Sequence, residues 1–292
     1  MRMQRGLSRW FCFGAALAVW LWSAAVLLPS FSPAQAAVPK TEFSAAVIGA
    51  LQQELAAVEA RMADKSEQHL MGIRFVTGSL NGRRVVLVRC GIGKVNAAMV
   101  TTLVLSRFHP RRVIFTGIAG GLRSDLAPGD IVIATKVTYH DYGGVSAVGF
   151  APSATQDPVT GRKNPRFFAC DPHLVKAAEE AAASAKLERV ATSRGLRRPR
   201  VVKGVVVTGD VFVASPAKAA ELRRIFGADV VEMEGAAVAQ VCWQQKVPFL
   251  ILRSVSDSAG KMAFAEMVRF LKSAAENSAR ITTGLISRLA PE

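Results

Sequence analysis

Cysteine and acidic residues are scarce in this sequence. Only 4 of the 292 residues are Cys, and their spacing matches no metal-binding signature. Cys12 falls in an apolar N-terminal run, and the other three, at 90, 170 and 242, cannot all pair with one another. Each is more typical of a small apolar residue than of a reactive thiol. The cysteines therefore indicate no metal site, and one disulfide is permitted but not required.

Acidic residues are outnumbered, with 22 Asp and Glu against 37 Lys and Arg, which gives a formal charge of +15. This excess permits acidic partners, nucleic acid or an anionic membrane surface, but it selects none of them. The 23 Gly and 13 Pro follow no period, which excludes collagen-like and low-complexity chains. Half of the residues are apolar, enough for a full core, so a wholly disordered chain is excluded as well.

The first forty residues are typical of an export signal rather than of a folded domain. Three arginines come first: Arg2, Arg5 and Arg9. An apolar stretch at 10–28 follows, and Ala34-Gln35-Ala36 then matches the small-x-small pattern of a cleavage site. We expect residues 1–36 to be a cleaved signal peptide and the protein to be exported, to a periplasm or the extracellular space. The alternative is an uncleaved membrane anchor formed by residues 10–28; no later segment is apolar enough to span a bilayer.

Apolar, β-branched runs alternate with helical patterns along the rest of the chain. The expected strands are 45–50, 73–77, 85–88, 113–116, 130–139, 201–207, 230–233 and 248–255. The expected helices are 52–62, 94–108, 171–185, 216–226, 235–245 and 264–289. Unbroken Val and Ile runs indicate a sheet covered on both faces, and Asn81-Gly82 indicates a hairpin with antiparallel pairing. The sequence predicts a single α/β domain over 37–292, a three-layer α/β/α sandwich with a central mixed β-sheet.

Polar residues just after the strands are the first candidates for a site, because such sheets bind ligands at the carboxyl ends of their strands. Glu54 lies one turn into the helix after the first strand, where it could act as a general base. A carboxylate favoured by the helix N-terminus is the alternative. Glycines within 116–121 would let the backbone approach a ligand closely. A tight turn explains them equally well, and the pattern is no dinucleotide fingerprint.

Two later segments place charged residues at strand ends. Glu232 and Glu234 flank a methionine in an otherwise apolar stretch, where burial without a partner is costly. That favours binding of sugar hydroxyls, although a pair satisfied by Arg and backbone N–H groups is the alternative. Arg253, Ser256 and Asp257 end the last predicted strand. A carboxyl there can donate to a purine nitrogen when protonated, or it can be the N-cap of the last helix.

The order of these segments resembles that of the 5′-methylthioadenosine/S-adenosylhomocysteine nucleosidases, within the nucleoside phosphorylase superfamily. Seven stretches carry the resemblance: AVIGALQQEL, GIGKVNAAM, TGIAGGL, GDIVIATKVTYHD, VVTGDVFVAS, VVEMEGAAVAQVC and VPFLILRSVSDSAG. They run in family order from Ala46 to Gly260 and cover most of the chain after the leader. The resemblance implies a nucleoside phosphorylase-like fold and hydrolysis of the N-glycosidic bond of adenine thionucleosides, which releases adenine.

The resemblance also implies a role for each matching position. Glu54 would activate the attacking water, and Asp257 would protonate or hydrogen-bond N7 of the leaving adenine. The residues that it implies for substrate binding are Phe212 stacked on the base, Val213 at the adenine edge through its backbone, Met233 and Glu234 at the ribose, Arg253 at the water or the ribose, Ser256 supporting the acid, and Ala119 and Gly120 in the glycine-rich turn. This chemistry protonates a leaving group and presents water to an oxocarbenium-like centre, so it requires no metal or redox cofactor.

The sequence departs from the family pattern in three respects. Ile118 stands where many members have a small polar residue near the water. The segment 141–171 does not look like the usual family loop. In the family this region, with Tyr139 and His140, approaches the pocket of a partner subunit, so a homodimer is implied and the choice of nucleoside is left open. Most members are cytosolic, whereas this chain carries an export signal.

Other functions remain as alternatives. A phosphorylase of the same fold would present Arg to phosphate after the first strand, but this chain has an acid there, Glu54, and no arginine before Arg61. Another nucleoside hydrolase of this fold, or a non-catalytic exported relative, is also considered, although Glu54, Glu234 and Asp257 together argue against the latter. The densest basic patch is Arg194, Arg197, Arg198, Arg200 and Lys203. It lacks interleaved aromatics, which favours a solvated loop over a nucleic-acid site.

Overall fold

The computed structural model describes residues 43–192 and 195–289. The predicted leader, residues 1–36, lies outside the described residues, so its cleavage and its alternative role as an anchor stay predictions. Arg194 of the basic patch also lies outside them. Among the helices of the described ranges, none combines the length and apolar character that crossing a membrane would need.

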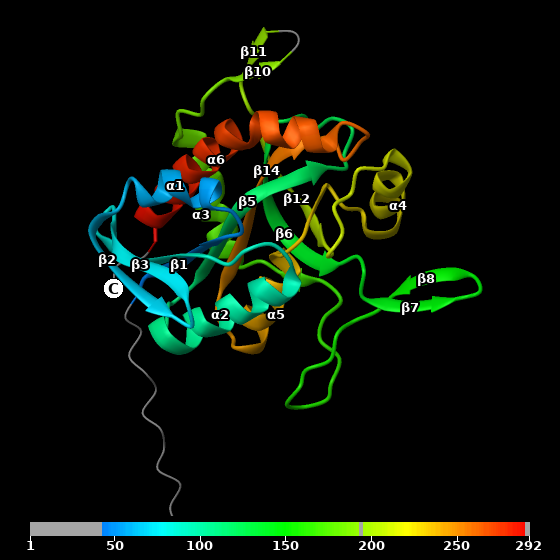
Figure 1. The fold of residues 1–292 in the computed structure, drawn as a ribbon, viewed down its shortest axis with the longest axis horizontal. Helices are drawn as coiled ribbons and strands as arrows, with labels where there is room; N and C mark the ends of the chain where they lie inside the picture. Colours follow the sequence, from blue (N-terminus) through cyan, green and yellow to red (C-terminus); the bar gives the residue numbers. More distant parts are fainter. Residues whose placement is uncertain (1–42, 193–194, 290–292) are drawn as a thin grey trace, which may run out of the picture. The chain divides into compact units, whose positions relative to one another are not determined.

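Strands and helices alternate along the described residues (Figure 1). The strands are β1 (Ala45–Gly49), β2 (Ala63–Leu70), β3 (Ile73–Leu80), β4 (Arg83–Arg89), β5 (Val113–Gly121), β6 (Ile131–Tyr139), β7 (Gly143–Ser146), β8 (Gly149–Pro152), β9 (Phe168–Ala169), β10 (Val190–Thr192), β11 (Gly195–Arg197), β12 (Val201–Thr208), β13 (Val230–Glu232) and β14 (Phe249–Asp257). The helices are α1 (Gln52–Glu59), α2 (Lys94–Phe108), α3 (Pro172–Ser184), α4 (Pro216–Phe226), α5 (Gly235–Gln244) and α6 (Ala263–Ser287).

Most of the strands form one mixed sheet in the order β13-β12-β6-β14-β5-β1-β4-β3-β2, with β9 paired to β6. β1 is parallel to β4 and β5, and β14 is parallel to β5. The β2–β3, β3–β4 and β6–β14 pairs are antiparallel. The predicted mixed sheet is confirmed. Asn81 and Gly82 form the turn between β3 and β4, and both have the positive φ that a two-residue hairpin turn favours.

Five of the strands close into a ring, which the predicted three-layer sandwich does not describe. β13 pairs in parallel with β12 and also antiparallel with the far end of β5, where Val230 lies opposite Gly121 and Val231 opposite Gly120. The ring is therefore β5, β14, β6, β12 and β13. Both β5 residues in this pairing are glycines, and a Cβ on Gly121 would lie 3.2 Å from Cγ1 of Val255 on β14.

Helices cover both faces of the sheet. α1, α3 and α6 pack together on one side, and α2 packs beside α5 on the other (Figure 1). The central strands are therefore buried: every residue of β1 and all nine of β14 lie in the interior. This burial explains the unbroken apolar runs from which the strands were predicted. The strand order places the carboxyl ends of β14, β5 and β1 beside one another.

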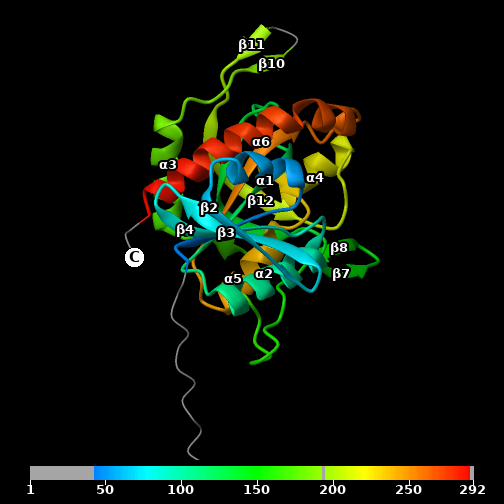
Figure 2. The ribbon, with the colours of Figure 1, turned by 60° about the vertical axis from the view of Figure 1, so that its left-hand side comes forward.

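Some elements escaped the sequence pattern. β2 is a polar strand at the edge of the sheet whose residues are mostly exposed, so it shows no apolar alternation. The segment 141–171 contains the hairpin β7–β8, and the basic segment before β12 contains the hairpin β10–β11. Both hairpins extend away from the sheet (Figures 1 and 2). Exposed strands of this kind lack the one-sided burial that makes strands readable from sequence.

Candidate active site

Arg253 is the only cation in a buried cluster of carboxylates at the carboxyl edge of the sheet, among the residues that the structure describes. Its side chain is 1% exposed, and its guanidinium lies 4.1 Å from the ring centroid of Phe115 on the neighbouring strand. Nη2 is paired with Glu232, and Oε2 of Glu234 lies 3.8 Å away. Burial alone would lower the pKa of Arg253, but the charges of Glu232, Glu234 and Glu54 outweigh burial and raise it. The guanidinium is therefore held in its charged form.

Glu232 is a site residue for which the family resemblance implied no separate role. Its carboxylate accepts hydrogen bonds from the Thr208 hydroxyl and from the backbone N–H groups of Glu234 and Gly235, at 3.2 Å and 2.7 Å. Together with Arg253, these donors match the alternative of a carboxylate satisfied by Arg and backbone N–H groups. The sequence already showed two acids, Glu232 and Glu234, in an otherwise apolar stretch. It did not show which of the two carboxylates would be bound by Arg253 and the backbone N–H groups.

Glu234 is held by the loop before α2. The Gly93 N–H donates to Oε1 of Glu234 at 2.8 Å. Burial raises the pKa of Glu234, the neighbouring charge of Glu232 raises it further, and Arg253 only partly offsets both. Glu234 therefore holds a proton more readily than an exposed glutamate does.

Glu54 is 3% exposed and reaches from α1 toward the end of β5. Oε2 accepts from the N–H groups of Ala50 and Leu51, both at 2.8 Å, and Oε1 accepts from the N–H of Ile118 at 3.0 Å. The carboxylate thus stabilises the helix N-terminus, as the alternative interpretation held, and it also faces the cluster. Burial raises the pKa of Glu54, while Arg253 and the three N–H donors oppose that rise without cancelling it.

Gly117 lets Glu54 and Arg253 approach each other. A Cβ built on Gly117 would lie 2.7 Å from Oε1 of Glu54 and would also collide with the guanidinium of Arg253. A tight turn is therefore not the full reason for the glycines at the end of β5. The absence of a side chain at Gly117 makes room for the carboxylate of Glu54 and the guanidinium of Arg253.

Asp257 ends β14, the strand that also carries Arg253, and lies on an adjoining part of the same edge. Oδ2 accepts from the Ser256 hydroxyl at 2.7 Å, and Oδ1 accepts from the Ala259 N–H at 2.9 Å. Burial raises the pKa of Asp257, and these two donors offset only part of the rise. The N-cap of α6 is Met262, so the alternative of Asp257 as the cap of the last helix is wrong.

The glycine-rich end of β5 borders Asp257. Gly120 lies opposite Asp257 in the parallel ladder, and a Cβ on Gly120 would lie 2.9 Å from its Oδ1. The Ser256 hydroxyl is also 3.4 Å from the carbonyl oxygen of Ala119. Ala119, Gly120, Ser256 and Asp257 therefore form one contiguous group, as the predicted site requires.

The remaining predicted residues lie around this edge with different exposures. Phe212 is 44% exposed, with its ring edge against Phe264 at a centroid distance of 6.4 Å, whereas Val213 is buried. Met233 is partly buried between the two glutamates. Tyr139 is partly buried, and its hydroxyl donates to Gln240 at 2.9 Å. His140 is buried against Gly209 within its own chain, and burial lowers its pKa.

A charged network that sequence analysis did not identify fixes the loop that holds Glu234. Asp141 accepts from Nζ of Lys94 at 2.7 Å and from the N–H of Asp210 at 2.9 Å. The N–H of Lys94 in turn donates to Asp210 at 2.8 Å. Because Gly93 precedes Lys94, this network ties the loop to the ends of β6 and β12. These acids and this lysine lie inside the motifs of the sequence, but only the fold shows that they meet.

The arrangement offers two distinct carboxyl functions. Glu54 is supported by three N–H donors and Arg253, which favours a carboxylate that can take a proton from water. Asp257 has a raised pKa and a hydroxyl neighbour, which favours a carboxyl that can share a proton with a basic nitrogen. Within the ranges 43–192 and 195–289, no His, Cys, Asp and Glu side chains are grouped as a metal site would need.

Comparison with known proteins places this geometry in a family. The sequence model of the Phosphorylase superfamily matches residues 44–287. A 5′-methylthioadenosine/S-adenosylhomocysteine nucleosidase of Anoxybacillus flavithermus is 41% identical over 245 residues, which cover 84% of this chain and 98% of the relative. A nucleosidase of this name from Psychromonas ingrahamii is 38% identical over 244 residues, which cover 83% of this chain and 98% of the relative.

Solved structures agree with the sequence relatives. The nucleosidase of Neisseria meningitidis in complex with methylthio-immucillin-A superposes with a TM-score of 0.73 at 39% identity, covering 83% of this chain and 98% of that one. A futalosine hydrolase of Helicobacter pylori has a TM-score of 0.71 at 29% identity, covering 84% and 97%. The chain belongs to the 5′-methylthioadenosine/S-adenosylhomocysteine nucleosidase family, within the Phosphorylase superfamily.

Proposed function

We propose that this protein hydrolyses the N-glycosidic bond of 5′-methylthioadenosine and S-adenosylhomocysteine and releases adenine. The observation that carries the proposal is the pair of buried carboxyls, Glu54 and Asp257, on neighbouring parts of one sheet edge, both with raised pKa values. Relatives of this name at about 40% identity support it, as does the solved structure of a relative with bound adenine.

The residues divide the reaction between nucleophile and leaving group. Glu54 takes a proton from the attacking water, and Arg253 beside it helps to hold that water. Asp257, oriented by the Ser256 hydroxyl, donates a hydrogen bond or a proton to N7 of the adenine, which relieves the negative charge that builds on the purine as the bond breaks. Glu234 binds the ribose hydroxyls, where positive charge develops on an oxocarbenium-like sugar.

The adenine ring has its own contacts in this scheme. Phe212 stacks on the adenine, which suits an exposed aromatic ring at the rim of the site. The backbone of Val213 reads the adenine edge, and Met233 packs against the ribose. Ala119 and Gly120 present backbone to the ligand, and the absence of a side chain at Gly120 supports this close approach.

Water is a better nucleophile for this site than phosphate. Glu54, Glu232 and Glu234 surround one guanidinium, that of Arg253, so the cluster carries excess negative charge whenever its acids are ionised. A phosphate dianion would be repelled there. Ile118 contributes its N–H to Glu54 but no side-chain donor, so the water depends on Glu54 and Arg253.

We propose further that the protein is a homodimer. Large apolar side chains are exposed along α2, on the hairpin β7–β8 and at its base. They are Ile92, Val95, Met99, Tyr142, Val145 and Val148. Exposed apolar patches of this kind mark interaction surfaces. Tyr139 and His140 lie in the strand and turn that lead into this hairpin, so they would support the partner's pocket rather than enter it.

We also propose that residues 37–292 form a single exported domain after removal of residues 1–36. The three N-terminal arginines, the apolar stretch 10–28 and the Ala-Gln-Ala site support this proposal.

Replacing Glu54 by Gln should abolish most turnover. The change keeps the shape of the side chain but removes the base, so hydrolysis should fall by about 10²–10⁴-fold, as expected for one acid–base group. Binding of a nucleoside analogue should survive. Release of free adenine is measured with and without phosphate, and Glu180→Gln, at an exposed position of α3, serves as the matched control. Near-normal hydrolysis by Glu54→Gln, or release of base only with phosphate, would contradict the proposal.

The pH profile of kcat/KM should have an acid limb above the range of an ordinary carboxyl. Glu54 must be ionised to act, and burial raises its pKa, so activity is lost as pH falls through that raised value rather than near the usual ~4.3 for Glu. A pH series of initial rates on methylthioadenosine measures the limb. Full activity down to about pH 4.5, close to the ordinary pKa, would show that Glu54 is not the group that titrates.

Light scattering at micromolar concentration should give the mass of two chains. Val95→Glu places a charge in the apolar face of α2 and should shift the protein toward monomer. Leu196→Glu, on the hairpin β10–β11 at the opposite side of the fold (Figure 1), should leave the mass unchanged. A wild-type protein that is monomeric and fully active would rule out the dimer.

Intact-mass analysis of the protein recovered from its native cell envelope should find a chain that begins at Ala37. A chain that begins at Met1 would instead identify residues 10–28 as an anchor.

A further inference from the structure

Lys94, the first residue of α2, binds two aspartates that follow neighbouring strands. Its Nζ lies 2.7 Å from Oδ2 of Asp141, shortly after β6, and 3.7 Å from Oδ2 of Asp210, shortly after β12. The Lys94 N–H also donates to Oδ1 of Asp210 at 2.8 Å. β6 and β12 are paired in the sheet, with Thr208 opposite Tyr139, whereas the start of α2 is not part of it. Lys94 therefore joins the start of α2 to the ends of these two strands.

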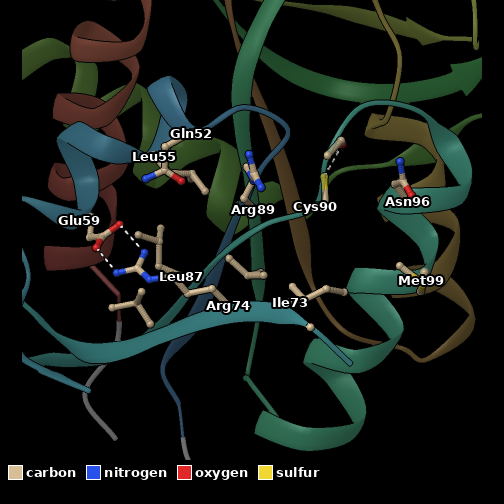
Figure 3. Close-up of a pocket in the computed structure, with 14 residues that line it drawn as sticks. Gln52, Leu55, Glu59, Ile73, Arg74, Leu87, Arg89, Cys90, Asn96 and Met99 are labelled. Atoms are coloured by element: carbon tan, nitrogen blue, oxygen red, sulfur yellow. Dashed lines mark hydrogen bonds and ion pairs between the residues drawn. The ribbon is translucent and has the colours of Figure 1, made fainter. Parts of the chain in front are cut away.

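The loop 91–93 depends on such contacts for a fixed position. It connects Cys90, just after β4, to the first turn of α2, where Asn96 lies (Figure 3). Two of its three residues are glycines with positive φ, 81° at Gly91 and 97° at Gly93, and glycine leaves the backbone the most conformational freedom. The Asn96 amide donates to the carbonyl in the middle of the loop at 2.8 Å. The ion pairs of the residue that follows the loop hold it on the side of β6 and β12.

Residues assigned to the substrate lie on both sides of this junction. The Gly93 N–H donates at 2.8 Å to Oε1 of Glu234, the carboxylate that binds the ribose in the proposed function. A Cβ on Gly93 would lie 3.2 Å from Oδ1 of Asp210, so this aspartate packs directly against the loop. Asp210 precedes Phe212 and Val213, which hold the adenine in the same scheme, in a segment without helix or strand. The contact of Asp210 with the loop therefore sets the adenine-binding segment relative to Glu234.

One ammonium compensates two carboxylates at this junction. Oδ1 of Asp141 is buried and has no hydrogen-bond partner among the described residues, so its charge is met through Oδ2. Within the ranges 43–192 and 195–289, Lys94 is the only cation in an ion pair with Asp141 or Asp210. Its Nζ also lies 5.7 Å from the ring centroid of Tyr139, which favours a positive charge there. Without the ammonium the two aspartates would repel each other, and Asp210 would shift together with the residues that follow it.

We propose that Lys94 is a positioning residue, which fixes the adenine-binding segment 210–213 relative to the ribose-binding Glu234. The proposal rests on the proposed function, because the roles of Glu234 and of this segment come from it. Lys94 touches neither the base nor the sugar in this scheme. It acts through Asp210 and Asp141 on one side and through the Gly93 N–H on the other.

The test compares two ligands by calorimetry in a Glu54→Gln background, which stops turnover. Methylthioadenosine contacts both Glu234 and the segment 210–213, whereas free adenine contacts only the segment. Lys94→Met should lower the affinity for methylthioadenosine relative to adenine by about two- to ten-fold, as misplacement of one hydrogen-bonding group predicts. In the otherwise wild-type enzyme it should lower kcat by about 10- to 100-fold, because a small misplacement of the reacting groups has that effect.

Two further variants separate positioning from general stability. Lys94→Arg keeps the charge and should restore most of the affinity ratio and of kcat. Lys203→Met breaks an exposed ion pair with Glu179, 2.9 Å long, near the start of β12, and should change neither value. An unchanged ratio in Lys94→Met would overturn the positioning role. An equal loss of affinity for both ligands would overturn it as well, because Lys94 would then only stabilise the fold.

A second-site variant tests the part played by charge. Asp210→Asn in the Lys94→Met background removes the like charge and keeps a side-chain oxygen that accepts from the N–H of residue 94. It should recover part of the lost kcat, and a double variant no more active than Lys94→Met would contradict the charge explanation. Adenine release by the wild type is measured separately. No release there would reject the proposed function, whereas equal release by the wild type and by Lys94→Met would reject the role of Lys94 alone.

Discussion

The buried guanidinium of Arg253 is the interaction on which the site depends. A charge with 1% of its side chain exposed costs several kcal/mol to desolvate unless partners surround it. Glu232 supplies the direct ion pair, Glu234 and Glu54 add their charges, and the face of Phe115 covers the remaining side. The partners come from three separate parts of the chain, α1, β5 and the junction of β13 with α5, so the carboxyl edge of the sheet is assembled around one cation.

The charge balance of this cluster explains its proton chemistry. Three carboxylates share one guanidinium, and Glu232 takes the closest position. Glu54 and Glu234 are left with less compensation than their burial demands, so the pKa of each is raised. A carboxyl with a raised pKa accepts a proton from water more readily at neutral pH than an ordinary one does. The environment that makes the cluster costly to bury is thus the one that suits it to hydrolysis.

Glycine and the closure of the sheet make this packing possible. Gly117 leaves room for Glu54 and Arg253 to meet, and Gly120 leaves room for Asp257. The end of β5 also pairs with β13, which closes the ring of five strands and brings the Glu232 segment beside the end of β5. A side chain at either glycine would push apart groups that the chemistry needs close together.

The sequence by itself determined the alternation of strands and helices, the Asn81-Gly82 hairpin, and the presence of Glu54 and Asp257 near strand ends, because burial and turn geometry leave local patterns. Only the tertiary structure decided that Glu232 rather than Glu234 pairs directly with Arg253 and that β13 closes onto β5. β2, polar and exposed at the sheet edge, also left no pattern to read. These features depend on which distant segments become neighbours, and strand order, not local periodicity, sets that.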